Sequence, residues 1–298
     1  MDIPELQLRE AYWDDPAAKA AFGALLREVF GIDFSLWDRA GFWDDDYRPF
    51  TLFDRDGRAV SSVCLYSMRV VVGGRLCRVG QLSGVATRPE WRRRGLAMRL
   101  AGHALARSAE FGHPFQYLFA DDHAVPLYQR LGFAPVAEYL TSIELSSRRA
   151  PIAGARRLDP ESPDDVRLVH RLACERAPVS LEFSALNERL VLYYALVALR
   201  DAFWFVEPLG VVVAARRVDH VLKVYDIIGR EIPALDEVYP YLADPMDRQV
   251  QLYFAPDQMG DLARLGMSTQ RPFLGNNLHV RGSFPLTAPV SFPITAQA

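Results

Sequence analysis

The sequence feature that most constrains this chain is an arginine-rich turn between an extended segment and a helical one. Residues 78–87 alternate and are rich in β-branched and small side chains, and residues 98–111 have the apolar spacing of a helix. Gly95 has no side chain and Ala97 only a methyl group, so the backbone of the turn can approach a ligand closely. Free N–H groups and the positive end of the dipole coincide at a helix N-terminus, and we therefore predict a diphosphate site here.

A second block stands about thirty residues further along the chain. Residues 116–121 predict a strand, and residues 124–133, AVPLYQRLGF, predict a short helix. The pattern Arg92-x-x-Gly95-x-Ala97 resembles the acyl-CoA pyrophosphate loop of the GNAT superfamily of N-acetyltransferases. The second block resembles the Leu-Tyr-x-x-Leu-Gly-Phe signature of the same family. Arginine-rich turns with one glycine are common, but the two blocks in this order make a strong resemblance.

The resemblance implies an α/β fold of the GNAT acyltransferase type, with a mixed, mostly antiparallel central sheet flanked by helices. Period-two patterns over residues 50–87 predict three antiparallel strands that lead into the turn. Asp15 and Pro16 mark the start of a preceding helix, and Gly31 marks its end. Residues 135–145 are expected to complete this sheet.

The length of 298 residues favours two domains, and the small and polar stretch from Ser146 to Ala155 indicates a linker. We expect residues 1–146 to form a GNAT acetyltransferase domain with an acetyl-CoA site. Residues 147–155 would be the linker, and residues 156–298 would form a degenerate GNAT-like domain, so that the fold occurs in tandem.

The second half repeats part of the first. Residues 250–267 align without gaps on residues 116–133, and Arg130-Leu-Gly recurs as Arg264-Leu-Gly. No Arg-x-x-Gly-x-Ala turn follows Ile228, so we expect this copy to lack a diphosphate site. The other elements predicted in this half are helices over residues 163–176 and 184–200 and strands over residues 203–206, 211–216 and 221–228.

For the site, the resemblance implies acetyl transfer from acetyl-CoA, the acyl-donor substrate, to an amine by direct attack in a ternary complex. The N–H of Val85 or Ala86 would polarise the thioester carbonyl. Tyr128 stands where the family carries the general acid that protonates the thiolate, and the structural alternative is a buried tyrosine bonded to a backbone carbonyl. The residues expected to bind the cofactor are Val85, Ala86, Thr87, Arg92, Arg93, Arg94, Gly95, Leu96, Ala97 and Met98.

The sequence does not identify the group that takes the proton of the attacking amine. The family often has a glutamate on the strand before the loop, where this chain has Gln81 and Ser83. The other titratable residues near the motifs, each more readily explained by a structural role, are Asp121, Asp122, His123 and Glu144.

Residues 32–47 are unusually rich in aromatic and acidic side chains, among them Trp37, Trp43 and the triplet Asp44 to Asp46. In the family the segment after the first helix lines the acceptor side. The resemblance therefore implies an acceptor that is a cationic small molecule or a peptide N-terminus. A loop packed on the sheet with a solvated acidic rim explains the same residues.

Composition limits the classes of function and partner that this chain can have. A net charge of -3 and a pI near 6.1 give no sign of nucleic-acid binding. Cys64, Cys77 and Cys174 have no paired spacing and are expected to be reduced core thiols, and the histidine spacing predicts no metal site. Neither a signal peptide nor an apolar run of membrane length is evident, so we expect a cytoplasmic chain with no membrane partner. The sequence leaves open whether the protein forms a homodimer.

Two functions fit these observations. The first is an N-acetyltransferase with one working site in its first half. The second is a non-catalytic acyl-CoA-binding sensor, which the missing strand carboxylate favours and Tyr128 opposes. In layout the chain resembles mycothiol-synthase-like and enhanced-intracellular-survival proteins. The latter resemble this chain only in part, because they carry a third domain whose C-terminal carboxylate assists catalysis. The tail, residues 285–298, is too short for such a domain, so we do not carry that role across.

Overall fold

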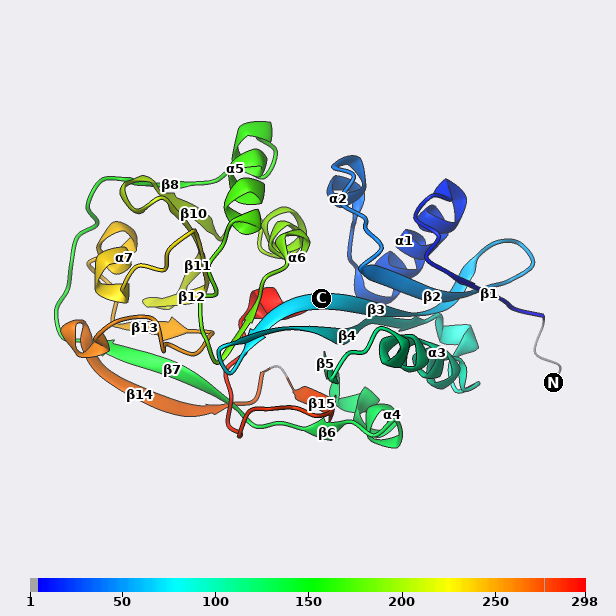
Figure 1. Cartoon of the computed structure of the whole chain (residues 1–298). Coiled ribbons are helices and arrows are strands. Elements are labelled where there is room, and N and C mark those ends of the chain that lie inside the picture. Colours follow the sequence, from blue (N-terminus) through cyan, green and yellow to red (C-terminus); the bar gives the residue numbers. More distant parts are fainter. Residues whose placement is uncertain (1–4, 276) are drawn as a thin grey trace.

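The structure, a computed structural model, describes residues 5–275 and 277–298. These residues form two mixed sheets with helices packed on them, and the chain runs from one sheet to the other (Figure 1). The predicted α/β class with mostly antiparallel sheets flanked by helices is confirmed. Residues 1–4, on which part of the signal-peptide expectation rests, lie outside the described residues.

The first sheet has the order β1-β2-β3-β4-β5-β15-β6, and β9 pairs with the end of β3. Neighbours are antiparallel except β4 and β5, which are parallel because the helix α3 crosses between them. In Figure 1, α1 and α2 lie above this sheet and α3 and α4 lie below it. The strands are β1 (Gln7–Glu10), β2 (Tyr47–Phe53), β3 (Ala59–Val72), β4 (Arg75–Thr87), β5 (Phe115–Phe119), β6 (Ala134–Pro135), β9 (Phe183–Ala185) and β15 (Leu278–Gly282).

The second sheet has the order β8-β10-β11-β12-β13-β7-β14. It repeats the plan of the first sheet, because antiparallel strands lead to one parallel pair, β12 with β13. Of the predicted repeat, the strand is confirmed, but the short helix is reduced to one 3-10 turn, Leu262–Arg264. The strands are β7 (Glu138–Leu145), β8 (Ala155–Arg157), β10 (Phe203–Val206), β11 (Val211–Val218), β12 (Val221–Ile228), β13 (Gln249–Leu252) and β14 (Gly266–Phe273).

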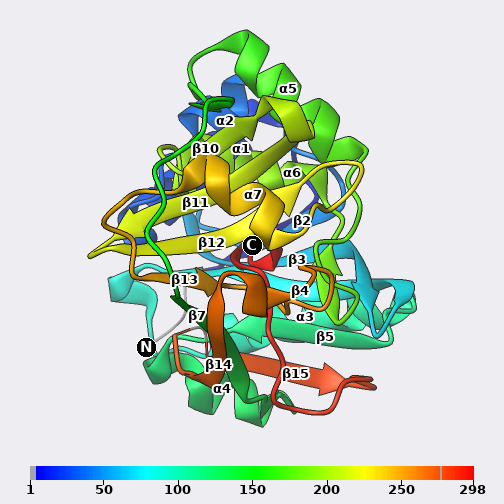
Figure 2. The ribbon, with the colours of Figure 1, turned by 90° about the vertical axis from the view of Figure 1, so that its left-hand side faces the viewer.

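Each half of the chain gives strands to the sheet of the other half: the first half gives β7, and the second half gives β15 and the short β9. β7 lies between β13 and β14, whereas β15 lies beside β5 in the first sheet (Figures 1 and 2). The prediction that residues 135–145 complete the first sheet is therefore wrong for β7, and only β6 lies there. The alternation of the segment predicts a strand and its two faces, but it carries no information about which strand it pairs with.

Local signals account for the helices. Asp15 caps α1 by accepting from the N–H groups of Ala17 and Ala18, and Gly31 ends the helix at a φ of 71°, as predicted. The predicted helix over residues 184–200 begins later, because Asn187 caps it by accepting from the N–H of Leu190. The helices are α1 (Pro16–Phe30), α2 (Ser35–Arg39), α3 (Leu96–Glu110), α4 (Val125–Arg130), α5 (Pro163–Cys174), α6 (Glu188–Tyr193), which continues as a π-turn (Tyr194–Ala198), and α7 (Leu235–Leu242).

One continuous apolar core joins the two sheets. It contains residues of β3, β5 and β9 together with residues of α5, α6 and β11. Phe183 and Phe292 stack within it with ring centroids 3.7 Å apart. The tail crosses this core, and the Thr295 hydroxyl donates to Asp226, which is also paired with the buried Arg176. The two halves therefore share one core and are packed together, rather than being joined only by a flexible linker.

The cysteines are only partly as expected. Cys64 is buried and burial raises the pKa of its thiol to about 12, but Cys77 is half-buried and Cys174 is exposed. Cys174 is the last residue of α5, where the pattern of the helix places it away from the core. The prediction of a core thiol is therefore wrong for Cys174.

Candidate active site

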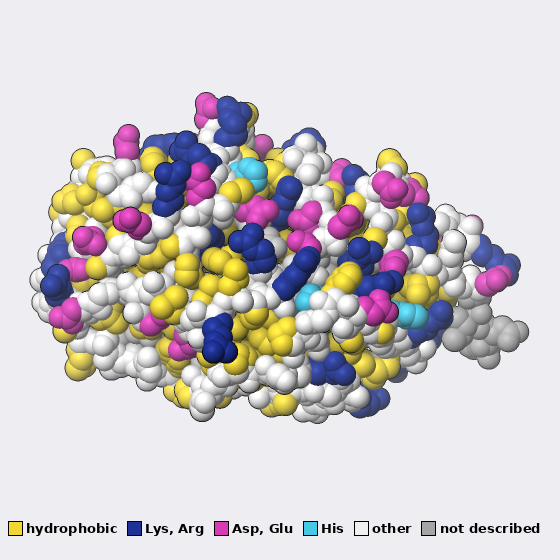
Figure 3. All heavy atoms as spheres, viewed as in Figure 1, with side chains coloured by type: hydrophobic (Ala, Val, Ile, Leu, Met, Phe, Trp, Pro, Cys, Tyr) yellow, Lys and Arg dark blue, Asp and Glu magenta, His cyan; other side chains and the backbone are white. Residues whose placement is uncertain are grey.

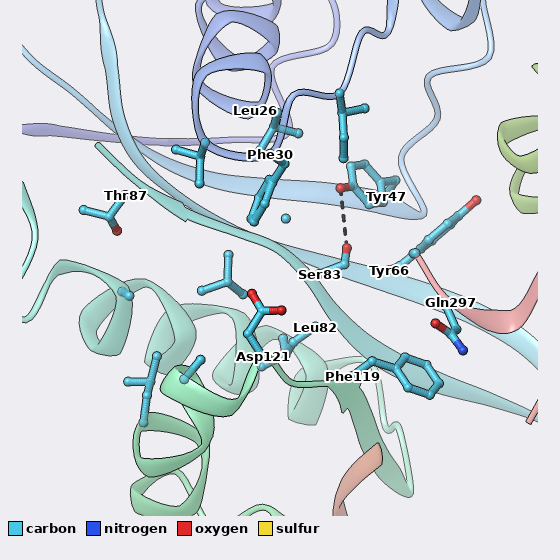
Figure 4. A pocket seen from close by; sticks show the side chains of 18 of the residues that line it. Leu26, Phe30, Tyr47, Tyr66, Leu82, Ser83, Thr87, Phe119, Asp121 and Gln297 are labelled. Atoms are coloured by element: carbon cyan, nitrogen blue, oxygen red, sulfur yellow. Dashed lines mark hydrogen bonds between the residues drawn. The ribbon is translucent and has the colours of Figure 1, made fainter. Parts of the chain in front are cut away.

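The site begins where β4 and β5 separate. The two strands pair at Gly80 with Gln116 and at Gln81 with Tyr117, and β4 then continues to Thr87. A cavity of about 1040 Å³ lies along this divergence. Leu82 to Val85 line it from β4, and Asp121 lines it just beyond the end of β5. Figure 4 shows Leu82, Ser83 and Asp121 around this space.

A β-bulge shapes the β4 wall. Ser62 pairs with Ala86 and Cys64 pairs with Ser83, so that Val63 alone faces Gly84 and Val85. A bulge leaves one residue out of the ladder, which frees backbone groups toward the cavity. Gly84 has a φ of 54°, and a Cβ there would lie 3.1 Å from both Cys64 Sγ and Tyr47 Oη, so the position requires glycine.

The arginine-rich turn has the predicted geometry. Arg93 and Gly95 have positive φ values of 62° and 74°, and α3 then begins at Leu96 with no side-chain cap. The first amides of the helix therefore have no intrahelical acceptor. Of the residues predicted to bind the cofactor, those that line the cavity are Val85, Thr87, Arg92, Arg93, Gly95, Leu96, Ala97 and Met98.

Two residues of the predicted set lie elsewhere. Ala86 is fully buried beneath α1 and is not part of the cavity wall. Arg94 stacks on Trp91, with the guanidinium carbon 4.9 Å from the ring centroid, and donates to the carbonyl of Glu90. Alternate side chains of a strand face opposite sides, which explains Ala86, and the adjacent aromatic ring explains Arg94.

Tyr128 lines the cavity from α4 and is 5% exposed. Within the described residues its hydroxyl has no hydrogen-bond partner, so the alternative of a tyrosine bonded to a backbone carbonyl is not what the structure contains. Burial, and secondarily the charge of Asp121, raise the pKa of Tyr128 to about 12. Its phenol is therefore protonated at neutral pH and available as a proton donor.

The titratable residues noted from the sequence divide into two groups. Asp121 and His123 line the cavity. Asp122 instead accepts from Asn277, and Glu144 lies on β7 in the second sheet. Asp44 also lines the cavity, and burial raises the pKa of its carboxyl.

Side chains of the aromatic segment, residues 32–47, line the cavity. Tyr47 faces Ser83, and the Ser83 hydroxyl donates to Tyr47 Oη over 3.4 Å (Figure 4). The structural alternative was a loop packed on the sheet with a solvated acidic rim. It fits Asp45, which is exposed, but it does not fit Asp44, which is partly buried.

Residues of the second half, which no sequence motif indicated, complete the lining of the cavity. Leu190, Tyr193 and Tyr194 line the same cavity from α6 and its π-turn. Gln297 and Ala298 line it as well, and the Ala298 amide donates to Gln81 Oε1 over 3.2 Å. From its length alone, the tail is not expected to take the role of the C-terminal carboxylate that the resembled family has, yet its last two residues line the cavity. No local pattern in residues 285–298 signals this position.

Two observations bear on other kinds of site. Across residues 5–275 and 277–298, no three histidine, cysteine, aspartate or glutamate side chains converge as a metal site would need. No helix in the same residues is long and apolar enough to span a bilayer. On the face seen in Figure 3, basic and acidic side chains are interspersed.

A bulged strand that diverges from its parallel neighbour thus leads into a glycine turn at a helix N-terminus, as the resemblance to the GNAT family implies. Residues 17–136 match the family model described as an acetyltransferase (GNAT) domain. An uncharacterized N-acetyltransferase of Streptomyces griseus is 35% identical over 115 residues, which are 38% of this chain and 27% of that protein. The chain therefore matches well under two thirds of the length of this relative.

Solved structures extend the likeness to both halves. A GCN5-related N-acetyltransferase from Kribbella flavida superimposes on 93% of this chain and 71% of its own, with a TM-score of 0.57 and 18% identity. Eis1 from Mycobacterium abscessus covers 93% of this chain and 73% of its own, with a TM-score of 0.55 and 16% identity. At these identities the likeness concerns the fold. Residues 17–136 therefore match the GNAT acetyltransferase domain, and the fold of both halves is similar to that of these structures.

Proposed function

We propose that this protein is an N-acetyltransferase that transfers acetyl from acetyl-CoA to a primary amine by direct attack in a ternary complex. The observation that carries the proposal is the cavity itself. The amides of the arginine-rich turn, the bulge at Val85 and the hydroxyl of Tyr128, which has no hydrogen-bond partner among the described residues, all lie on this cavity. These are the three groups that the chemistry needs.

Each of these groups has one role in the proposed reaction. The amides from Arg93 to Met98 hold the diphosphate, and the side chains of Arg92 and Arg93 add positive charge. The main-chain N–H of Val85 donates to the thioester oxygen, on which negative charge develops during attack. Ala86 is less suited to this task, because its backbone is paired with Ser62 in the ladder.

The acceptor ammonium first loses one proton to water, and the neutral nitrogen then attacks the thioester carbon. The C–N bond forms as the C–S bond breaks, and Tyr128 gives its proton to the departing thiolate. The proton that the attacking nitrogen sheds returns to the tyrosinate through solvent, so that CoA leaves as a free thiol.

Two measurements test the proposal. Acetyl-CoA is expected to raise the melting temperature of the protein, and CoA thiol is expected to be released only when an amine acceptor is present. Gly95→Glu is the negative control, since it places a carboxylate beside the diphosphate amides and a Cβ at a φ of 74°. This variant should lose the thermal shift with acetyl-CoA.

The rival function is the acyl-CoA-binding sensor. It predicts the same thermal shift but no acceptor-dependent release of CoA with any amine. The absence of a carboxylate on β4, where Ser83 faces Tyr47, is the observation that favours it. Release of CoA that requires an amine would exclude the sensor.

A further inference from the structure

Ser83 is a polar residue of the cavity wall close to the bulge. It lies on β4 two residues before Val85, whose N–H is assigned to the thioester oxygen, and it is 5% exposed. Successive side chains of a strand face opposite sides. Leu82 packs with apolar residues of α3, whereas the Ser83 side chain faces Tyr47 on the other side of the sheet (Figure 4).

The Ser83 hydroxyl is oriented by its neighbours. It donates its proton to Tyr47 Oη over 3.4 Å. The Tyr47 phenol is in turn hydrogen-bonded to the Cys64 thiol, and burial, with a smaller effect of that thiol, raises the pKa of the phenol well above its ordinary value. Tyr47 therefore stays protonated, gives its one proton to Cys64 and accepts from Ser83. The Ser83 proton is thus directed at Tyr47, and lone pairs of the Ser83 oxygen stay free to accept from a ligand.

Tyr47 is held in a fixed position. Its ring stacks on Trp13 at 6.1 Å and meets Tyr66 edge-on at 5.1 Å, measured between ring centroids. Its carbonyl accepts from Trp13 Nε1 over 2.8 Å. A Cβ on Gly84 would lie 3.1 Å from Tyr47 Oη, so the phenol also lies against the backbone of the bulge. A group fixed in this way orients Ser83 without having to reorganise when substrates bind.

Within the described residues, the hydrogen-bonded groups behind Tyr47 have no outlet to solvent. Cys64 Sγ lies 4.0 Å from Ser62 Oγ, the Ser62 hydroxyl is bonded to that of Thr51, and Thr51 is bonded to Tyr12, which is 2% exposed. Burial raises the pKa of the Cys64 thiol to about 12 and that of the Tyr12 phenol well above its ordinary value, so both are protonated at neutral pH. This chain can orient Ser83, but it has no group that would take up the proton of an amine.

Ser83 is also close to where the attacking nitrogen must lie. Residues i and i+2 of a strand are about 6.6 Å apart. With the thioester oxygen bound at Val85, this separation leaves room for a nitrogen about 3 Å from both the thioester carbon and the Ser83 oxygen. Tyr128 packs on the opposite face of β4, in the apolar cluster that contains Leu82. The amine therefore approaches from the face of Ser83, and the proton donor for the thiolate lies on the other face.

From these contacts we infer that Ser83 is the residue that contacts the attacking nitrogen. Its oxygen accepts one N–H of the neutral amine, which points the nitrogen lone pair at the thioester carbon. Tyr47 acts through Ser83 and is a positioning residue. No proton passes to either side chain, so the ammonium still loses its proton to water as in the proposed reaction. The inference rests on the proposed function, which it deepens by one substrate contact.

Steady-state rates of CoA release test the contact, with acetyl-CoA as donor and ethanolamine, phenethylamine and glycinamide as probe amines. For the fastest of these amines, Ser83→Ala should lower kcat/KM about three- to tenfold, as the loss of one neutral hydrogen bond would. The thermal shift with acetyl-CoA should be unchanged, which a merely structural defect would not allow. Tyr47→Phe keeps the ring, removes the acceptor of the Ser83 proton and should cause a similar loss. The double variant should lose no more than Ser83→Ala alone, because Tyr47 acts only through Ser83.

Ser62→Ala is the matched control, because it removes a hydroxyl from the same chain at a residue that does not line the cavity. Its rates should equal those of the wild-type protein, and a loss as large as that of Ser83→Ala would mean that the chain conducts protons instead of orienting Ser83. Wild-type rates in Ser83→Ala would overturn the contact and leave the proposed function intact. Losses that multiply in the double variant would overturn the role of Tyr47. If no amine releases CoA from the wild-type protein, the proposed function itself fails, and the inference fails with it.

Discussion

At the residue scale, Tyr128 carries the clearest prediction. Tyr128→Phe removes one hydroxyl and keeps the ring, which packs edge-on against Phe133. Because a general acid contributes about 10²–10⁴-fold to a rate, turnover should fall by about 100-fold or more. The thermal shift with acetyl-CoA should be unchanged, since the diphosphate amides lie on another element.

The matched control is Tyr241→Phe, on α7 and outside the cavity, which should keep full turnover. Initial rates of CoA release at saturating amine and acetyl-CoA provide the measurement. A fully active Tyr128→Phe enzyme would remove the acid assignment and leave the cofactor site intact.

His113 gives a pH prediction. Burial, aided by the positive charge of Arg78, lowers the pKa of His113 from 6.5 to about 4, and its Nδ1 is hydrogen-bonded to Ser108. The unfolded chain therefore binds this proton at a higher pH than the folded protein does. The stability that the neutral ring provides is complete above pH 6.5 and is lost as the pH falls toward 4.

Urea unfolding between pH 7 and pH 4.5 measures this loss. One proton corresponds to a slope of at most about 1.4 kcal/mol per pH unit, and His113→Gln should have a slope smaller by up to that amount. Parallel curves for the two proteins would show that another group dominates the acid transition.

At this scale the convergence of Arg93, Gly95 and Tyr128 on one cavity could be predicted from sequence, because these residues belong to local motifs with a fixed backbone meaning. The part of the cavity that is lined by residues 32–47 and by α6 could be predicted only in part. Trp37 and Asp44 lie in one aromatic stretch, but Tyr193 reaches the cavity through tertiary packing that leaves no local pattern.

At the scale of elements, the pairing of β14 with β7 requires glycine at one position. A Cβ on Gly266 would lie 1.7 Å from the carbonyl oxygen of Glu144, which is backbone and has no means to turn aside. Gly266→Ala should therefore displace the end of β14 and lower the melting temperature by several degrees, as a loss of about 1–3 kcal/mol would.

Gly102 in α3 is the matched control. A Cβ there meets no atom within 4 Å, so Gly102→Ala should stabilise the helix by about 0.5–1 kcal/mol. Differential scanning calorimetry of both variants checks the pair. A stable Gly266→Ala protein would mean that β14 is free to shift along β7.

Element boundaries were predicted well where caps exist. Asp15 and Gly31 fix α1, whereas the start of α6 was predicted too early because residues 183–185 extend to pair with β3. The sheet that β7 joins could not be predicted from local signals, because the alternating pattern of this strand fits either sheet.

At the scale of the whole molecule, the strand exchange predicts that neither half folds alone. A fragment of residues 1–150 lacks β15 beside β5, and a fragment of residues 151–298 lacks β7 beside β13. Expressed together, the two fragments should copurify with one cooperative melting transition, because the apolar core spans both.

Circular dichroism measures whether each fragment melts cooperatively alone and in the pair, and gel filtration measures whether the two fragments associate. The control is the intact chain with a protease site inserted in the exposed stretch of residues 147–153, which should stay associated after cleavage. A monomeric, cooperatively melting fragment of residues 1–150 would contradict the prediction.

The same exchange of strands imposes a delay during synthesis, because two paired strands are far apart in the sequence. β5 leaves the ribosome with its outer edge uncovered, and the strand that covers it, β15, is translated roughly 160 residues later. At 5–20 residues per second this is a wait of about 10–30 s. During that wait the nascent chain presents a bare hydrogen-bonding edge and half an apolar core, so the protein should depend on holding chaperones in proportion to how slowly it is translated.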